Sequence, residues 1–190
     1  LAHDTAALNK WEAGRDLAKD SLLRMLTDDA APDSAYLEAI AHMLRDDSLD
    51  PAFRALTLGL PSQDDLAQAL YDSGTTPDPM AIWTAHETMK QAMAEQLQDT
   101  LPRIYAEMQT EGPYSPDAEP AGKRALGNSA LSLLTRLDGG AQARKQYAAA
   151  DNMTQQLAAL SCLLNAEDAD AELEAFYKKW QHERLVIDKW

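Results

Sequence analysis

Residues 86–90 read HETMK, which is the most chemically suggestive spacing in the chain. The stretch begins like the zinc-binding sequence H-E-x-x-H, in which two histidines one helical turn apart bind the metal and the glutamate acts as a base. Here Lys90 stands where the second histidine would be, and a protonated ammonium group has no lone pair with which to bind zinc. We therefore interpret His86 as a structural residue on or beside an apolar helix stripe.

A di-iron site is excluded by the same kind of reasoning. Such a site in a helix bundle needs Glu-x-x-His pairs on facing helices. The residues three positions before the histidines His42, His86 and His182 are Ala39, Trp83 and Lys179. His3 has too few residues before it, so none of the four histidines has the required glutamate.

The remaining reactive side chains are also interpreted as structural. Cys162 lies in an apolar stretch without a basic partner, so we expect a buried small hydrophobe rather than a nucleophile. The acidic pair Asp46-Asp47 and the acidic run at 167–174 are expected to be solvated, and Met89 and Met93 to fill the core. The sequence thus predicts no catalytic, cofactor-binding or metal-binding residue in this chain.

The composition predicts an all-helical protein. Among the 190 residues are 34 alanines and 27 leucines but only 4 isoleucines and 1 valine, so the β-branched apolar residues that favour strands are scarce. The formal net charge of −14 repels phosphate backbones and anionic lipid, which argues against nucleic-acid and membrane partners. The single cysteine rules out an internal disulfide and fits a reducing compartment, so a cytoplasmic location is expected.

Apolar residues at three- and four-residue steps mark the expected helices. A stripe from residue 83 to 108 spans about seven turns and is expected to be the longest element, with a kink or restart near Thr100 because Pro102 removes a backbone donor. The other stretches expected to be helical are 4–27, 34–45, 51–59, 62–74, 126–139, 141–150, 152–164 and 167–183. A capping box is expected at the start of 152–164, because the Asn152 side chain can cap the helix and Gln155, three residues later, can reach back to the backbone amide of the cap. They predict an all-α fold, an irregular solenoid-like stack of antiparallel helix pairs with about eight to ten helices.

Both ends of the sequence predict that the chain is a piece of a longer polypeptide. It begins at Leu1 without an initiator methionine and ends at Trp190 within an apolar stretch, whereas natural C-termini are usually polar. Leu185, Val186, Ile187 and Trp190 would then lack their packing partners, so self-association of the chain is expected.

Four short stretches together carry a family resemblance. They are 10–14 (KWEAG), 123–128 (KRALGN), 152–154 (NMT) followed by 157–160 (LAAL), and 185–190 (LVIDKW), and they occur in the matching order along essentially the whole chain. With them the chain resembles the helical C-terminal domain of bacterial aminopeptidase N, the alanyl aminopeptidase type of zinc metallopeptidase.

The resemblance implies that residues 1–190 are one helical domain, the first part of the C-terminal helical domain of a larger multidomain enzyme. The parent would be a cytoplasmic, zinc-dependent hydrolase that degrades peptides from their N-terminus, with zinc in another domain. This segment would be non-catalytic and would enclose the active-site cavity, which restricts access to short peptides. Its partners would be the other domains of the polypeptide and short peptide substrates.

The residues also allow a different reading. Irregular arrays of helix pairs often serve as freestanding scaffolds or adaptors that bind a protein partner through a groove. The flanking sequence distinguishes the two, because an H-E-x-x-H segment several hundred residues upstream selects the peptidase and a natural stop after Trp190 selects the scaffold.

Overall fold

The computed structural model describes residues 7–166 and 169–188, and these form helices without a strand. Eleven helices are present in these ranges, one more than the upper number expected, because a four-residue helix follows the last predicted one. The helices are α1 (Ala7–Thr27), α2 (Ser34–Arg45), α3 (Pro51–Thr57), α4 (Gln63–Asp72), α5 (Pro79–Leu97), α6 (Leu101–Glu107), α7 (Ala118–Asp138), α8 (Ala141–Ala149), α9 (Met153–Asn165), α10 (Asp170–Trp180) and α11 (Arg184–Ile187). Among these helices, none combines the length and hydropathy needed to cross a bilayer.

Side-chain caps set the starts of α2, α3, α4 and α5. Asp33, Asp50 and Asp78 each accept hydrogen bonds from two backbone amides of the helix that follows, and the last two precede a proline in the first turn. Ser62 and Asp65 form a reciprocal capping box at α4. These caps satisfy amide groups that have no partner inside the helix, so α2, α3 and α4 begin within one residue of their predicted starts. The α7 helix has no side-chain cap and begins at Ala118, eight residues before the expected 126.

Proline and glycine end helices at two places in the chain. The stripe from residue 83 to 108 is two helices, α5 and α6, with the restart at Thr100 that Pro102 predicts. It is therefore not the longest element, since α1 and α7 have 21 residues each and α5 has 19. The α7 helix ends, as expected, at Gly139 and Gly140, whose φ angles of 62° and 85° are ones that residues with a side chain rarely adopt.

The start of α9 differs from the expected capping box. Asn152 accepts a hydrogen bond from the Gln155 amide at 3.0 Å, as expected. The Gln155 side chain does not reach back to the cap amide; it accepts a 2.6 Å hydrogen bond from the Asn152 side-chain amide instead. One orphan amide is thus satisfied, and the second interaction holds the cap side chain in place.

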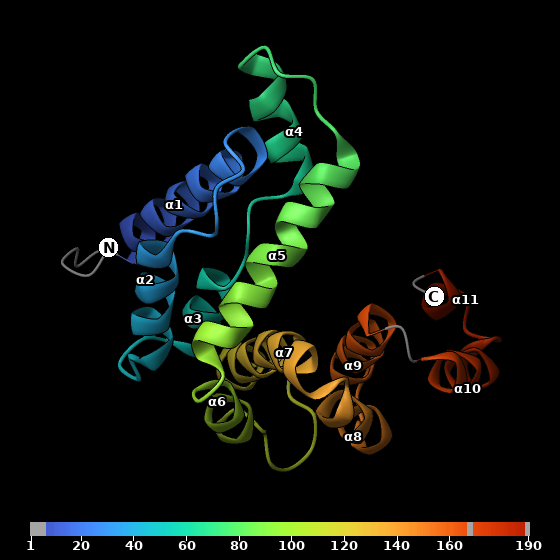
Figure 1. The fold of residues 1–190 in the computed structure, drawn as a ribbon. Coiled ribbons are helices and arrows are strands. Elements are labelled where there is room, and N and C mark those ends of the chain that lie inside the picture. Colours follow the sequence, from blue (N-terminus) through green and yellow to red (C-terminus); the bar gives the residue numbers. More distant parts are fainter. Residues whose placement is uncertain (1–6, 167–168, 189–190) are drawn as a thin grey trace.

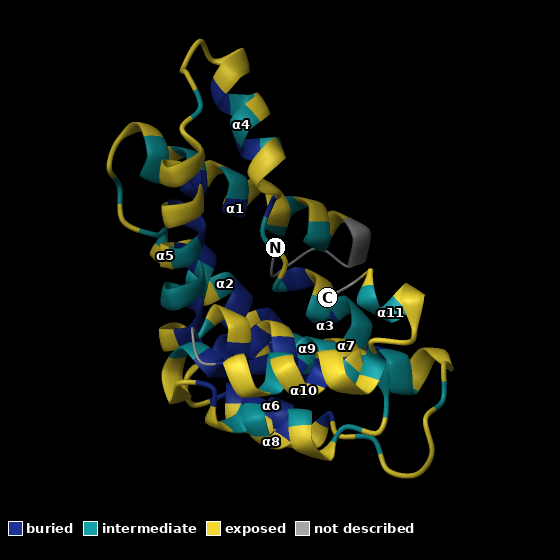
Figure 2. Ribbon diagram, turned by 90° about the vertical axis from the view of Figure 1, so that its right-hand side faces the viewer, coloured by how far each residue is buried: buried dark blue, intermediate teal, exposed yellow. Residues whose placement is uncertain are grey.

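The α7 helix is the centre of the fold, with α1–α6 on one side and α8–α11 on the other (Figure 1). It packs against α3, α5 and α6 on the first side and against α8 and α9 on the second. Buried residues gather where these helices face one another, whereas α10 and α11 are mainly exposed or half-buried (Figure 2).

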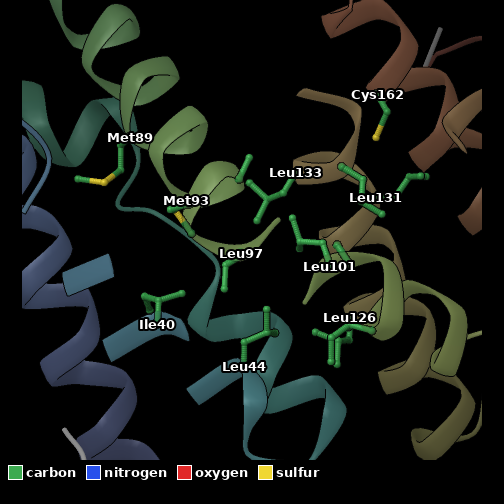
Figure 3. Close-up of a cluster of buried hydrophobic side chains, with 14 of the residues drawn as sticks. Ile40, Leu44, Met89, Met93, Leu97, Leu101, Leu126, Leu131, Leu133 and Cys162 are labelled. Carbon is green, nitrogen blue, oxygen red and sulfur yellow. The ribbon is translucent and has the colours of Figure 1, made fainter. Parts of the chain in front are cut away.

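One apolar cluster extends through most of the helices. Figure 3 shows its central part, which runs from Ile40 of α2 past Met93 and Leu97 of α5 to Leu131 of α7 and Cys162 of α9. Burying this apolar surface is the main force that fixes α5, α7 and α9 relative to one another. The irregular stack of helices that the sequence predicts is confirmed.

The last helix exposes apolar surface. Leu185 of α11 is 82% exposed, and Val186 and Ile187 are half-buried. Trp190, the fourth member of the apolar cluster expected at this end, lies outside the described residues. Self-association through this end stays a prediction, which light scattering over a concentration series would check.

Candidate functional site

His86 and Lys90 lie one turn apart on α5 and face different surroundings. His86 is only 6% exposed, and its Nε2 atom is buried without a hydrogen-bond partner among the described residues. The Lys90 Nζ atom donates to Glu87 Oε1 at 2.9 Å. Within residues 7–166 and 169–188, no group of three or more His, Cys, Asp or Glu side chains is placed to hold a metal ion.

Glu87 joins two helices that are far apart in the sequence. Its Oε2 atom accepts a 2.5 Å hydrogen bond from Arg136 of α7, and its Oε1 atom accepts the bond from Lys90. Burial alone would raise the pKa of Glu87, but the hydrogen bonds and positive charges of Lys90 and Arg136 outweigh it and lower that pKa. The carboxylate therefore stays ionised and holds α5 against α7.

Two hollows lie on either side of this ion-pair network. The first, of about 330 Å³, lies between the loop that joins α3 to α4, the middle of α5 and the middle of α7. His86, Lys90 and Ser129 contribute to its wall. The second, of about 260 Å³, lies between α7 and α9 and is lined by Arg136 and Cys162. Together they make the junction of α5, α7 and α9 the part of the described surface that we select as the candidate site.

The burial of His86 predicts a stability that depends on pH. Burial, helped by the positive charge of Lys90, lowers the pKa of His86 below its ordinary 6.5. The unfolded chain then binds a proton more readily than the folded chain, so the free energy of unfolding falls as the pH drops through the ordinary 6.5 of histidine. We expect His86→Gln to flatten this dependence in urea melts recorded at a series of pH values.

The matched control for this measurement is His42→Gln. His42 is exposed on α2, so this variant should keep the pH dependence of the unmodified chain. Equal slopes for the His86 variant and the unmodified chain would show that His86 does not carry the effect. Titration of Glu87 does not contribute to this pH dependence, because its lowered pKa changes the free energy of unfolding only as the pH falls through its ordinary 4.5.

The other residues singled out in the sequence lie as follows. Cys162 is buried, and burial raises the pKa of its thiol, which disfavours the reactive thiolate. Met89 and Met93 are core residues, whereas Trp83, expected in the same apolar stripe, is 50% exposed. Part of the acidic run, Glu167 and Asp168, lies outside the described residues.

Polar residues that sequence reasoning did not single out connect four helices. Gln146 of α8 accepts a hydrogen bond from the Tyr105 hydroxyl of α6 at 2.9 Å, and its amide donates at 3.0 Å to Asn128 of α7 and to the Gln155 carbonyl of α9. Asn128 ends the KRALGN stretch and Gln155 follows the NMT stretch. These two stretches of the resemblance therefore lie at one buried junction between helices.

The KRALGN stretch also brings neighbouring elements close to α7. Arg124 donates to the Ser115 carbonyl at 2.6 Å, and its guanidinium lies 4.5 Å from the centre of the Tyr114 ring. A Cβ atom at Gly127 would lie 3.4 Å from the Met108 side chain, which is an ordinary van der Waals contact, so the end of α6 lies directly against α7 at this position. The residues of this stretch are thus explained by packing.

The KWEAG stretch of α1 is likewise explained by packing. Lys10, Trp11 and Gly14 line a narrow space of about 10 Å³ against α2 and the end of α3. The Arg15 guanidinium that follows lies 5.6 Å from the centre of the Trp11 ring and bonds Asp65 of α4 at 2.8 Å. This end of α1 therefore connects α2, α3 and α4.

Among known proteins, this chain is similar to aminopeptidases. Aminopeptidase N of Caulobacter vibrioides is 38% identical over 98% of this chain, and aminopeptidase N of Escherichia coli is 37% identical over 80%. The chain spans only 22% and 18% of the lengths of these two relatives. The resemblance of this chain to aminopeptidase N is thus confirmed.

A solved structure shares the fold. The crystal structure of Legionella pneumophila aminopeptidase A in complex with aspartic acid superposes with a TM-score of 0.79 at 24% identity, over 98% of this chain and 23% of that one. A family model described as "Domain of unknown function (DUF3458_C) ARM repeats" matches residues 1–190. With its stacked helices and a match along its whole length, the chain belongs to the DUF3458_C family of ARM-repeat domains.

Proposed function

We propose that residues 1–190 are the non-catalytic helical part of a zinc-dependent aminopeptidase that removes N-terminal amino acids from peptides. The observation that supports this most is the 38% identity to aminopeptidase N of Caulobacter vibrioides along nearly all of this chain. The zinc would be bound by another part of the polypeptide, because Lys90 stands in place of the second histidine.

In this proposal the helical stack encloses the active-site cavity and admits short peptides. The junction of α5, α7 and α9 supports such a role, because its hollows of about 330 and 260 Å³ have room for a few peptide side chains. The partners are then the other domains of the same polypeptide and short peptides in a cytoplasmic enzyme. The lone buried Cys162 is compatible with that reducing compartment.

The test compares the 190-residue chain with the full-length polypeptide that contains it. We expect the full-length polypeptide to bind zinc and to hydrolyse an alanyl anilide, and the 190-residue chain to do neither. Metal analysis after dialysis and the release of the anilide measure both. Stoichiometric zinc together with turnover in the 190-residue chain would refute a non-catalytic role.

A size series tests the enclosing role. Peptides of increasing length with N-terminal alanine, and a folded protein with the same N-terminus, are offered to the full-length polypeptide. We expect kcat/KM to fall steeply between short peptides and the folded protein, because an enclosed cavity excludes compact substrates. Equal rates would contradict this role. A full-length polypeptide that hydrolyses no peptide would instead favour the alternative of a freestanding scaffold that binds a protein partner through a groove.

A further inference from the structure

An exposed aromatic ring and a lysine lie in line along α5. Trp83 and Lys90 are seven residues apart, which is close to two full turns, so their side chains leave the helix in nearly the same direction. At about 1.5 Å per residue, the two positions lie roughly 10 Å apart along the helix axis. Trp83 is 50% exposed, and Lys90 lines the hollow of about 330 Å³.

The charges around Lys90 leave a local excess of positive charge. Lys90 and Arg136 share the single carboxylate of Glu87, and burial keeps His86 neutral at pH 7. Asp65 stands near the loop side of the hollow, but its carboxylate accepts from the Ser62 amide and pairs with Arg15. The net charge of −14 repels anions at long range, but this local excess of positive charge favours a carboxylate that reaches the hollow.

Polar groups in the same wall suit such a ligand. The hydroxyl-bearing residues Ser129 and Ser132 of α7 line the hollow beside Lys90. His86, which is 94% buried, also lines it and has an Nε2 atom without a hydrogen-bond partner among the described residues. The other ring nitrogen of His86 donates to the Pro61 carbonyl, which leaves only a lone pair at Nε2 of the neutral imidazole, so Lys90 and the hydroxyl groups, not His86, would bind the carboxylate.

We propose that the α5 and α7 helices bind an extended peptide that carries an apolar side chain and a carboxylate three residues apart. The apolar side chain contacts Trp83, and the carboxylate enters the hollow beside Lys90. The spacing follows from the geometry, because roughly 10 Å along α5 corresponds to about three residues of a chain in the extended polyproline II conformation at about 3.1 Å each, in which side chains three residues apart point the same way. This inference rests on the proposed function in one respect, namely that peptides reach this face.

The test measures binding without catalysis. Hexapeptides labelled with fluorescein on the N-terminal amine have no free amine, so an aminopeptidase does not cleave them. Fluorescence anisotropy measures the binding of these peptides to the full-length polypeptide. The first peptide carries a leucine and a glutamate three positions apart and has an amidated C-terminus. The second is the same peptide with glutamine in place of the glutamate. A third peptide has no acidic side chain but a free C-terminal carboxylate three positions after the leucine, which distinguishes the two sources of carboxylate.

We expect saturable binding of the carboxylate peptides and weaker binding of the glutamine peptide. Lys90→Gln should raise the Kd of the carboxylate peptides by about two- to fivefold, the range of a partly exposed ion pair, and leave that of the glutamine peptide unchanged. Trp83→Ala should weaken all three peptides. Lys90→Arg, which keeps the charge, should recover most of the lost affinity.

Matched controls use residues of the same type elsewhere. Lys178→Gln removes an exposed lysine that pairs with Glu174 on its own helix, and Tyr71→Ala removes an exposed aromatic ring on α4. Neither should change any Kd. The inference is overturned by the absence of saturable binding, which is the result if another domain covers this face, or by equal losses in the controls.

The outcomes also separate the inference from the proposed function. Hydrolysis of the alanyl anilide without binding of the blocked peptides would reject the peptide groove alone. Binding of the blocked peptides that depends on Lys90, without hydrolysis, would reject the aminopeptidase proposal and leave the groove in place.

Discussion

Replacing Phe176 by alanine should lower the free energy of unfolding by about 3–5 kcal/mol. Phe176 is fully buried, and its ring lies 6.3 Å from that of Trp180, whose indole N–H donates to Gln156 of α9 at 3.3 Å. The substitution leaves a cavity between α10 and the rest of the fold, so both the lost burial and the lost packing reduce stability. Urea melts followed by circular dichroism measure the change.

The adjacent Tyr177 provides the control. Its side chain is 42% exposed, so Tyr177→Ala should cost much less than Phe176→Ala although both remove an aromatic ring from the same helix. A loss below about 1 kcal/mol for Phe176→Ala would show that α10 does not pack against α9 as the structure has it.

Replacing Gln146 by alanine should lower the free energy of unfolding by about 2–4 kcal/mol. The substitution removes three hydrogen bonds, to the Tyr105 hydroxyl, the Asn128 side chain and the Gln155 carbonyl. The side chains of Gln146 and Tyr105 are buried, so groups that lose their partner are poorly placed to bond with water instead. Chemical melts give the magnitude, and the junction of α6, α7, α8 and α9 should exchange its amide hydrogens faster.

Lys145→Ala is the matched control on the same helix. Lys145 precedes Gln146 and is exposed, so its truncation should change the free energy of unfolding by less than about 0.5 kcal/mol. A Gln146 variant as stable as the Lys145 variant would mean that the network adds no stability beyond what water provides in the unfolded chain.

The sequence by itself determined the local features of this protein. Helix starts at Ser62 and Asn152, the stop at Gly139 and the restart near Thr100 all depend on residues within one or two turns, and the structure confirms them. The fold class follows from the same local preferences, because a chain rich in alanine and leucine and nearly without valine has little propensity for strands. The family resemblance is local in the same sense, since short stretches of consecutive residues carry it.

Tertiary structure alone decided which distant residues meet. Glu87 pairs with Arg136, 49 positions later, and Tyr105 bonds Gln146, 41 positions later. Neither pairing has a local signature, since each depends on the angles and distances at which whole helices pack. The exposure of Trp83 was mispredicted for the same reason: periodicity shows which residues share a helix face but not whether another helix covers it along its whole length. The hollows beside Lys90 and Arg136 form only where three helices converge, so no spacing within one helix could reveal them.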